Sequence, residues 1–464
     1  MLHDHREVPL STTNPKALTH FEQALQRFHS YTGDPLEAID AALAEDPDFV
    51  LGHVFRATLL LHTSEARFLP EARAGLAAAE ALRNQANERE RGLIQAARRY
   101  VDGDWAGACR VWDEVLVDHP RDVFALQSAH LTDFFLGDAV NLRDRVARVL
   151  PHWDDSLPSY PYVLGMYAFG LEETNLYPQA EAVGREGLEL EPRDAWAVHA
   201  VAHVMEMQTR FDEGIDWLRS REQDWAPDNG FAFHNWWHLA LFHLERDDEA
   251  GALRLYDECI YPSTADDNDT MAMQMLDASA LLWRLYLRGA AVGERWTTLA
   301  DHWQARSSVE NGHYAFNDVH AVMAYLAAGR EQAVTNVLHA MTTVATGDTS
   351  NATMCREVGL PVARGLIAFH EGRHDEAVAL LRDTRLIAHR FGGSHAQRDL
   401  LNLTLLEAAL HGSRPRLAEH LVNERIAWKS TSPLTWNFAA RIRQRVGNGA
   451  GVQEARARVV ELRG

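Results

Sequence analysis

Three prolines at almost equal spacing constrain the fold of this chain more than any other feature of its sequence. Pro47, Pro120 and Pro192 lie 73 and then 72 residues apart. A proline cannot continue a helix, so each one predicts the end of one helix and the start of the next. The three surrounding stretches are similar: Asp46-Pro47-Asp48-Phe49, His119-Pro120-Arg121-Asp122-Val123-Phe124 and Glu191-Pro192-Arg193-Asp194-Ala195-Trp196.

This period is close to twice the roughly 34 residues of a tetratricopeptide repeat, which is a pair of antiparallel helices closed by a proline. Between the prolines, small and apolar residues recur at helical spacing. Few windows alternate apolar with polar residues as strands do. The sequence therefore predicts an all-α fold, a tetratricopeptide-like α-solenoid in which antiparallel helix pairs stack into a superhelix with a concave face.

The length of the chain also favours a repeat architecture. Its 464 residues exceed the roughly 250–300 residues at which a single core stops growing. The prolines and serines of residues 151–161 and the acidic residues 262–270 predict loops, but no low-complexity linker divides the chain. We therefore expect one continuous helical body over residues 1–464, in approximate blocks 1–150, 151–345 and 346–464.

Charge and cysteine content limit the expected partners and location. The chain has 45 Lys and Arg against 66 Asp and Glu, a formal net charge of −21. Phosphate binding needs concentrated cationic side chains, so neither nucleic acid nor membrane is an expected partner. The three cysteines are widely spaced, and the sequence shows no secretory signal or membrane-spanning run, which predicts a soluble cytoplasmic protein. An exposed edge of the superhelix would suit a homodimer.

Ionisable side chains recur at helical spacing on faces that are otherwise apolar. His199, His203 and Glu206 point within a roughly 60° wedge of one predicted helix. His234 and His238 repeat the four-residue step of the first pair. Burying such groups costs several kcal/mol unless they find partners, so we expect them to meet in a shared polar site.

Two further features extend this candidate site. Trp237 stands beside His238, and an indole next to imidazoles suits either the wall of a small-molecule pocket or core packing. Asn317 and His320 share a face after an Asn-Gly turn, and Asp318 lies off that face, where it would cap or orient a histidine. All of these residues are candidates for binding or acid/base chemistry.

A glycine-rich stretch opens the last candidate segment. His395 follows Gly392-Gly393-Ser394, where free backbone amides at a helix start can bind an anion. Arg398 and Asp399 continue the charge series on the predicted helix. The alternative is a simple turn with Ser394 as the helix cap.

The chemistry of these groups leaves alternatives open. His199, His203 and Glu206 would supply three ligands to a divalent metal with one open position. Acid/base work by a His-carboxylate pair fits equally well, because histidine titrates near neutral pH and a carboxylate fixes its tautomer. No nucleophile elbow, phosphate-binding loop or dinucleotide fingerprint accompanies them.

Several segments make the chain similar to the tetratricopeptide repeat protein 38 family. The resemblance covers most of the chain and implies a soluble, cytoplasmic superhelix of helix pairs, without an established reaction or substrate. It also adds Glu172 and Glu173 as candidate acids. The matching stretches are Asp46-Pro47-Asp48-Phe49, Gly165-Met166-Tyr167-Ala168-Phe169-Gly170-Leu171-Glu172-Glu173, His199-Ala200-Val201-Ala202-His203-Val204-Met205-Glu206-Met207, Phe233-His234-Asn235-Trp236-Trp237-His238-Leu239-Ala240-Leu241, Asn317-Asp318-Val319-His320-Ala321 and Gly393-Ser394-His395-Ala396-Gln397-Arg398-Asp399.

Two functional hypotheses follow. The first is an enzyme that acts on a small-molecule ligand by hydrolase- or lyase-type acid/base chemistry, because ionisable groups on apolar faces cost stability unless a function or a mutual network offsets them. The second is an interaction scaffold whose histidines form a structural network, with peptide partners in the concave face. The catalytic candidates of the first hypothesis are His203, Glu206, His234, His238, His320 and His395, and its substrate-binding candidates are His199, Trp237, Asn317, Asp318, Arg398 and Asp399.

Overall fold

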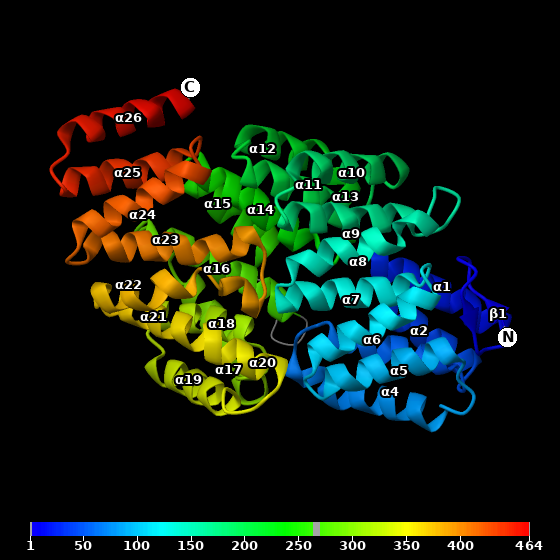
Figure 1. The fold of residues 1–464 in the computed structure, drawn as a ribbon. Coiled ribbons are helices and arrows are strands. Elements are labelled where there is room, and N and C mark those ends of the chain that lie inside the picture. Colours follow the sequence, from blue (N-terminus) through cyan, green and yellow to red (C-terminus); the bar gives the residue numbers. More distant parts are fainter. Residues whose placement is uncertain (1, 263–269, 464) are drawn as a thin grey trace. The chain divides into compact units, whose positions relative to one another are not determined.

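The computed structural model describes residues 2–262 and 270–463, and these residues are overwhelmingly helical (Figure 1). Within them, the one sheet pairs β1 (Leu2–His3) with β2 (Pro9–Leu10) in antiparallel register, with Leu2 opposite Leu10. The all-α prediction is therefore confirmed. No helix in the described part of the chain is long and apolar enough to cross a membrane.

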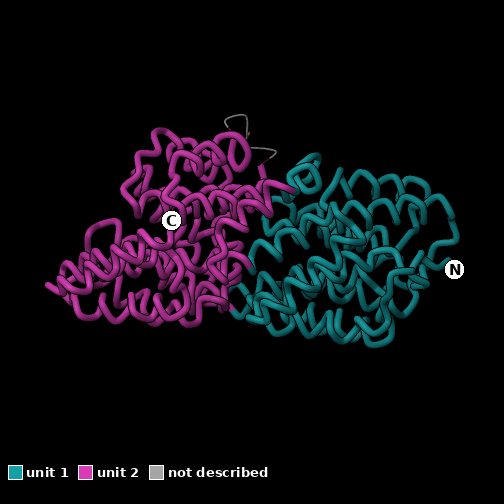
Figure 2. Tube along the Cα trace, turned by 90° about the horizontal axis from the view of Figure 1, so that it is seen from above, with its two compact units in different colours: residues 1–204, 221–232, 348–351 teal, residues 205–220, 233–347, 352–464 magenta. Residues whose placement is uncertain are grey.

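The chain forms two compact units, drawn in different colours in Figure 2. Unit 1 contains residues 1–204, 221–232 and 348–351, and unit 2 contains residues 205–220, 233–347 and 352–464. The single continuous body in three blocks stays a prediction. The predicted loop at 262–270 lies almost wholly outside the described residues.

Unit 1 is built from helix pairs in which consecutive helices pack on each other, for example the first with the second and the ninth with the tenth. Its largest fully buried side chains include Trp112 and Trp225. Its helices are α1 (Pro15–Ser30), α2 (Pro35–Glu45), α3 (Val50–Leu61), η1 (Ala66–Phe68), α4 (Leu69–Ala81), α5 (Glu88–Val101), α6 (Trp105–Asp118), α7 (Val123–Leu136), α8 (Ala139–Val149), η2 (Leu150–His152), α9 (Tyr160–Glu173), α10 (Tyr177–Leu190), α13 (Glu222–Trp225) and most of α11 (Ala195–Met207).

Unit 2 continues the same pattern of packed helix pairs, with Trp237 and Trp283 fully buried in its core. Its helices are α12 (Phe211–Ser220), α14 (Ala232–Glu245, from Phe233), α15 (Glu249–Leu255), the π-helical η3 (Tyr256–Ile260), α16 (Ala272–Leu287), α17 (Arg295–Glu310), α18 (Ala315–Ala327), α19 (Glu331–Val344), the end of α20 (Ser350–Met354), the π-helical η4 (Cys355–Gly359), α21 (Leu360–His370), α22 (His374–Thr384), η5 (Ala388–Phe391), α23 (His395–His411), α24 (Pro415–Trp428), α25 (Pro433–Arg445) and α26 (Gly449–Arg463).

The three repeated prolines lie where the sequence predicts, in the short loops after α2, α6 and α10. An aspartate in the second and third of these loops starts the following helix. The side chain of Asp122 accepts a hydrogen bond from the Ala125 N–H at 3.0 Å, and that of Asp194 accepts from the Trp196 N–H at 2.9 Å. These caps satisfy donors that would otherwise lack partners at a helix start. The repeat therefore combines a proline that ends one helix with an acid that begins the next.

Candidate functional site

The predicted site residues are divided between the two units. His199 and His203 belong to unit 1, and the other ten belong to unit 2. Nearly all of them are buried, and only His395 and Arg398 are partly exposed. We therefore describe the surroundings of these residues unit by unit.

In unit 1, two neighbouring helices bring imidazoles and acids together. The rings of His199 and His203 on α11 lie 4.4 Å apart, edge to face. The Nδ1 atom of His203 is 3.5 Å from a carboxylate oxygen of Glu172 at the end of α9. Ligand atoms of Glu172, Glu173 and His203 all lie within 4.8 Å of one another and are buried, so this set can hold a metal ion. The predicted metal set of His199, His203 and Glu206 draws on both units and stays a prediction.

In unit 2, both histidines of α14 face buried carboxylates. The Nδ1 atom of His238 is 3.1 Å from Glu206 Oε2, and the Nδ1 atom of His234 is 2.6 Å from Asp277 Oδ2 on α16. Burial lowers the pKa of His238 well below its usual value, and the nearby charges of His234 and Arg284 lower it further. The imidazole of His238 is therefore neutral near pH 7 and holds its acid partner by hydrogen bonding.

His320 and Asp318 on α18 form hydrogen bonds within their own helix and with the turn before it. The imidazole Nδ1 of His320 lies 2.7 Å from the Phe316 carbonyl oxygen, to which it donates a hydrogen bond, and burial lowers the pKa of His320 to about 4. Both carboxylate oxygens of Asp318 accept from the Gly312 N–H, at 3.0 and 3.2 Å. Asp318 therefore binds the turn before α18, whose N-cap residue is Tyr314, and its expected role of capping or orienting a histidine stays a prediction. Asn317 is buried on the same helix.

The start of α23 has the predicted turn and cap. Ser394 caps the helix, accepting from the Gln397 N–H at 3.3 Å. The guanidinium of Arg398 contacts His395 Nδ1 at 3.1 Å. Asp399 turns away from this pair and accepts two hydrogen bonds from Arg425, at 2.6 and 2.9 Å. The Ser394 cap of the turn-and-cap alternative is therefore present, and anion binding at this helix start stays a prediction.

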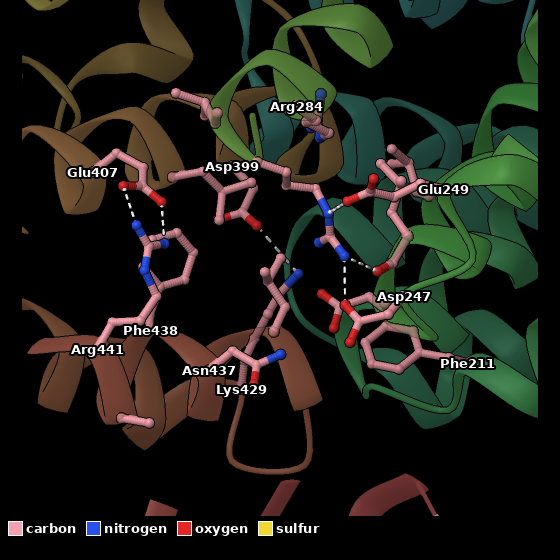
Figure 3. Close-up of a pocket in the computed structure, with 18 of the residues that line it drawn as sticks. Phe211, Asp247, Glu249, Arg284, Asp399, Glu407, Lys429, Asn437, Phe438 and Arg441 are labelled. Carbon is pink, nitrogen blue, oxygen red and sulfur yellow. Dashed lines mark hydrogen bonds and ion pairs between the residues drawn. The ribbon is translucent and has the colours of Figure 1, made fainter. Parts of the chain in front are cut away.

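A cavity of about 600 Å³ in unit 2 lies among α14, α16, α23 and α25 (Figure 3). The cavity is partly open to solvent, as shown by the side chain of Arg441, which lines it and is 48% exposed. Two predicted site residues, Glu206 and Asp399, contribute to its lining. No histidine is among the described residues that line it. The cavity and the histidine pairs of unit 2 are therefore different features.

Ion pairs occupy the cationic side chains on both walls of this cavity (Figure 3). Arg441 on α25 pairs with Glu407 on α23, with Nη2 and Oε2 2.9 Å apart. On the opposite wall, Arg288 donates to Glu249 at 2.9 Å and to Asp247 at 2.5 Å. Phe211, Phe242 and Phe438 are among the apolar side chains between them.

Arg284 on α16 is the exception among the buried cations of the cavity. Its guanidinium donates to two backbone carbonyl oxygens, those of Ala280 at 3.0 Å and Ala396 at 2.7 Å, and lies over the ring of Trp237. No carboxylate of the described residues forms an ion pair with it. Burial lowers the pKa of Arg284, and the charges of Asp399, Glu206 and Asp277 oppose this effect. Arg284 is therefore a fixed cation whose charge is incompletely balanced.

The remaining charged groups of the cavity form a loose network. The Nζ atom of Lys429 is 3.5 Å from Asp399 Oδ2 and 3.9 Å from Glu206 Oε1. Glu245 accepts a hydrogen bond from the Ser432 hydroxyl at 2.7 Å. Burial raises the pKa of Glu245, although the charges of Lys429 and Arg425 oppose the rise.

Sequence analysis found two acids of this cavity, Glu206 and Asp399. It missed Arg284, Glu245 and Lys429. A signal for Arg284 was present, because it is a lone charge in the apolar run Leu281-Leu282-Trp283-Arg284-Leu285. Such a charge on a buried face predicts a functional or structural partner as well as a histidine does. Lys429 follows the end of α24, where helical phasing gives no information.

No protein-family model matches this chain. Among solved structures, it is similar to a human IFIT1 dimer with m7Gppp-AAAA, with 14% identity, a TM-score of 0.44, and coverage of 98% of this chain and 96% of that one. It is also similar to the APC/C hetero-tetramer Cut9-Hcn1, with 12% identity, a TM-score of 0.43, and coverage of 93% and 78%. At these values neither protein assigns a function to this chain. The helix pairs described above make it a tetratricopeptide-like helical-repeat protein, and the narrower likeness to the tetratricopeptide repeat protein 38 family stays a prediction.

Proposed function

We propose that this protein is a helical-repeat binding scaffold, in which the histidines are structural and the cavity of unit 2 binds a ligand through a carboxylate. The observation that carries this proposal is Arg284, a buried guanidinium that lines a cavity of about 600 Å³ and has no ion-pair partner among the described residues. Pockets of this volume commonly bind small ligands or short segments of a partner. The proposal therefore separates the binding site from the histidines.

The histidine contacts favour a structural network over catalysis. His234 and His238 face Asp277 and Glu206 inside unit 2, and His320 bonds to its own helix. A catalytic acid or base must reach the atom that gains or loses the proton. No histidine lines the described cavity, so acid/base chemistry by these side chains stays a prediction without a supporting contact.

A carboxylate fits Arg284 better than a phosphate does. The planar guanidinium matches a carboxylate in a bidentate geometry. Glu206, Glu245 and Asp399 also line the cavity, and their negative charge opposes a dianion more strongly than a monoanion. Apolar side chains such as Leu241 and Phe242 complete the lining and suit a ligand with an apolar part. Two classes of ligand carry such a carboxylate: small organic acids and acidic peptides.

Thermal-shift titrations with three probes test this proposal: a panel of small monocarboxylic acids, a panel of acidic peptides, and inorganic phosphate. We expect at least one carboxylate panel, and not phosphate, to raise the melting temperature of the wild type. Binding at 100 times Kd stabilises a folded protein by about 2.7 kcal/mol. The panel that produces the shift identifies the source of the carboxylate.

Variants connect the shift to Arg284. Arg284→Gln should weaken carboxylate binding at least tenfold, which is about 1.4 kcal/mol. Arg284→Lys retains the charge without the planar pair of donors and should give an intermediate loss. Arg110→Gln, an exposed residue of unit 1 with a 70% exposed side chain, is the control. Carboxylates that fail to stabilise the wild type, or that bind Arg284→Gln as tightly, would overturn the proposal.

A further inference from the structure

The chain uses arginine for almost all of its cationic side chains. Of its 45 Lys and Arg residues, Lys16 and Lys429 are the only lysines. The side chain of Lys16 on α1 is 74% exposed, whereas that of Lys429 is 2% exposed and lines the cavity of unit 2. Both residue types carry a positive charge, but only the lysine amine can lose its proton and attack a carbonyl carbon. A requirement for charge alone would not explain lysine at this position.

The contacts of Lys429 leave its ammonium weakly held. Its two carboxylate neighbours lie at 3.5 and 3.9 Å, beyond ordinary hydrogen-bond distance. Asp399 is already bound by both ends of the Arg425 guanidinium, and Glu206 is already bound by His238. Lys429 therefore makes no close ion pair with either acid, although its charge helps to lower the pKa of Asp399 and opposes the rise in that of Glu245.

We infer that Lys429 forms an imine with a carbonyl carbon of a ligand in this cavity, and that the ligand is a small 2-oxo acid. The carboxylate half of this inference rests on the proposed function, because Arg284 would bind that group. Arg284 and Lys429 line the same cavity, and Asp399 acts on the charge of both. A 2-oxo acid carries its carbonyl carbon directly beside its carboxylate.

The reaction balances with side chains of the cavity. The ammonium gives one proton to Glu206, and the free amine attacks the carbonyl carbon, which forms the C–N bond. Glu245, whose pKa burial raises, protonates the carbonyl oxygen and takes a proton from the nitrogen. A second transfer through Glu245 releases the oxygen as water, breaks the C–O bond and leaves C=N. The two protons of the water come from the amine, and no electrons are exchanged.

Reductive trapping with peptide mapping tests the inference in the intact protein. The probes are glyoxylate, which has an aldehyde beside a carboxylate, and propanal, which has an aldehyde alone, each with cyanoborohydride. Lys16 is an internal reference because it is the only other lysine. With glyoxylate, we expect modification of Lys429 at least tenfold faster than modification of Lys16, despite its burial. Modification of Lys429 at or below the rate of Lys16 would overturn the inference.

Two variants distinguish this inference from the proposed function. Lys429→Arg keeps the charge and should abolish trapping at this position, because a guanidinium does not form the imine. Arg284→Gln should slow trapping by glyoxylate at least tenfold but leave trapping by propanal within about twofold. If carboxylates stabilise the protein but Lys429 is not trapped, the imine is rejected and the proposed carboxylate binding stands. If both probes modify Lys429 quickly and Arg284→Gln changes neither rate, Lys429 is a reactive amine but Arg284 does not bind the carboxylate.

Discussion

At the residue scale, Asp318 is a predicted site residue whose carboxylate accepts hydrogen bonds from the Gly312 N–H in the turn before α18. Burial raises its pKa to about 8, although hydrogen bonds from the Gly312 N–H oppose the rise. An unfolded aspartate has a pKa of roughly 3.9. Between these values the folded chain binds a proton that the unfolded chain does not, so the contribution of Asp318 to stability falls as pH rises and is constant above pH 8.

We therefore expect Asp318→Asn to become more stable relative to the wild type as pH rises from 5 to 8. The asparagine does not titrate, and its side-chain oxygen can still accept from Gly312. The difference in unfolding free energy should change by roughly 1 kcal/mol per pH unit. Urea denaturation of both proteins at each pH measures this difference. A difference that is constant over this range would show that Asp318 ionises normally.

At the scale of elements, the pair of His238 and Glu206 joins α14 to the end of α11 within unit 2. Their contact is 3.1 Å and both side chains are at least nine-tenths buried. His243 on the same helix pairs with Asp248 at 2.9 Å, but with side chains 19% and 40% exposed. The same residue pairing therefore occurs once inside the unit and once at its surface.

Replacing each of these histidines with leucine should have very different effects. Leucine at position 238 leaves a buried carboxylate without its hydrogen bond, and we expect a loss of about 3 kcal/mol in unfolding free energy. His243→Leu should cost less than about 1 kcal/mol, because water replaces an exposed pair. Chemical denaturation measures both. Equal, small losses of unfolding free energy in the two variants would contradict a structural role for His238 and favour a catalytic one.

The helices were predictable from local patterns, whereas the cavity was not. Pro47, Pro120 and Pro192 locate helix ends because a proline acts on its own neighbourhood. Helical phasing places Glu206 and Asp399 on polar stripes, and both line the cavity. Phasing cannot say which helices face one another across space. For that reason Arg284 and Lys429, from helices far apart in the sequence, could not be assigned to one site.

At the scale of the whole molecule, the formal net charge of −21 sets the field that any charged partner meets. Many of the cationic side chains form ion pairs with nearby acids, as Arg441 does with Glu407 and Arg288 with Glu249. Nucleic-acid binding depends on cations that replace the counterions of several phosphates. A small monoanion needs one unbalanced cation inside a cavity, which Arg284 supplies. The proposed function therefore favours a small carboxylate over a polyanion as the ligand.

This charge distribution predicts that a short single-stranded RNA oligonucleotide does not bind the protein. We expect no change in the fluorescence anisotropy of a labelled form up to roughly 100 µM protein, a concentration at the weak end of non-specific binding. Titrations at low and physiological salt separate electrostatic attraction from specific contacts. Binding that weakens steeply with salt would reveal a basic surface that the net charge conceals. Binding that is insensitive to salt would point to a specific site for the bases.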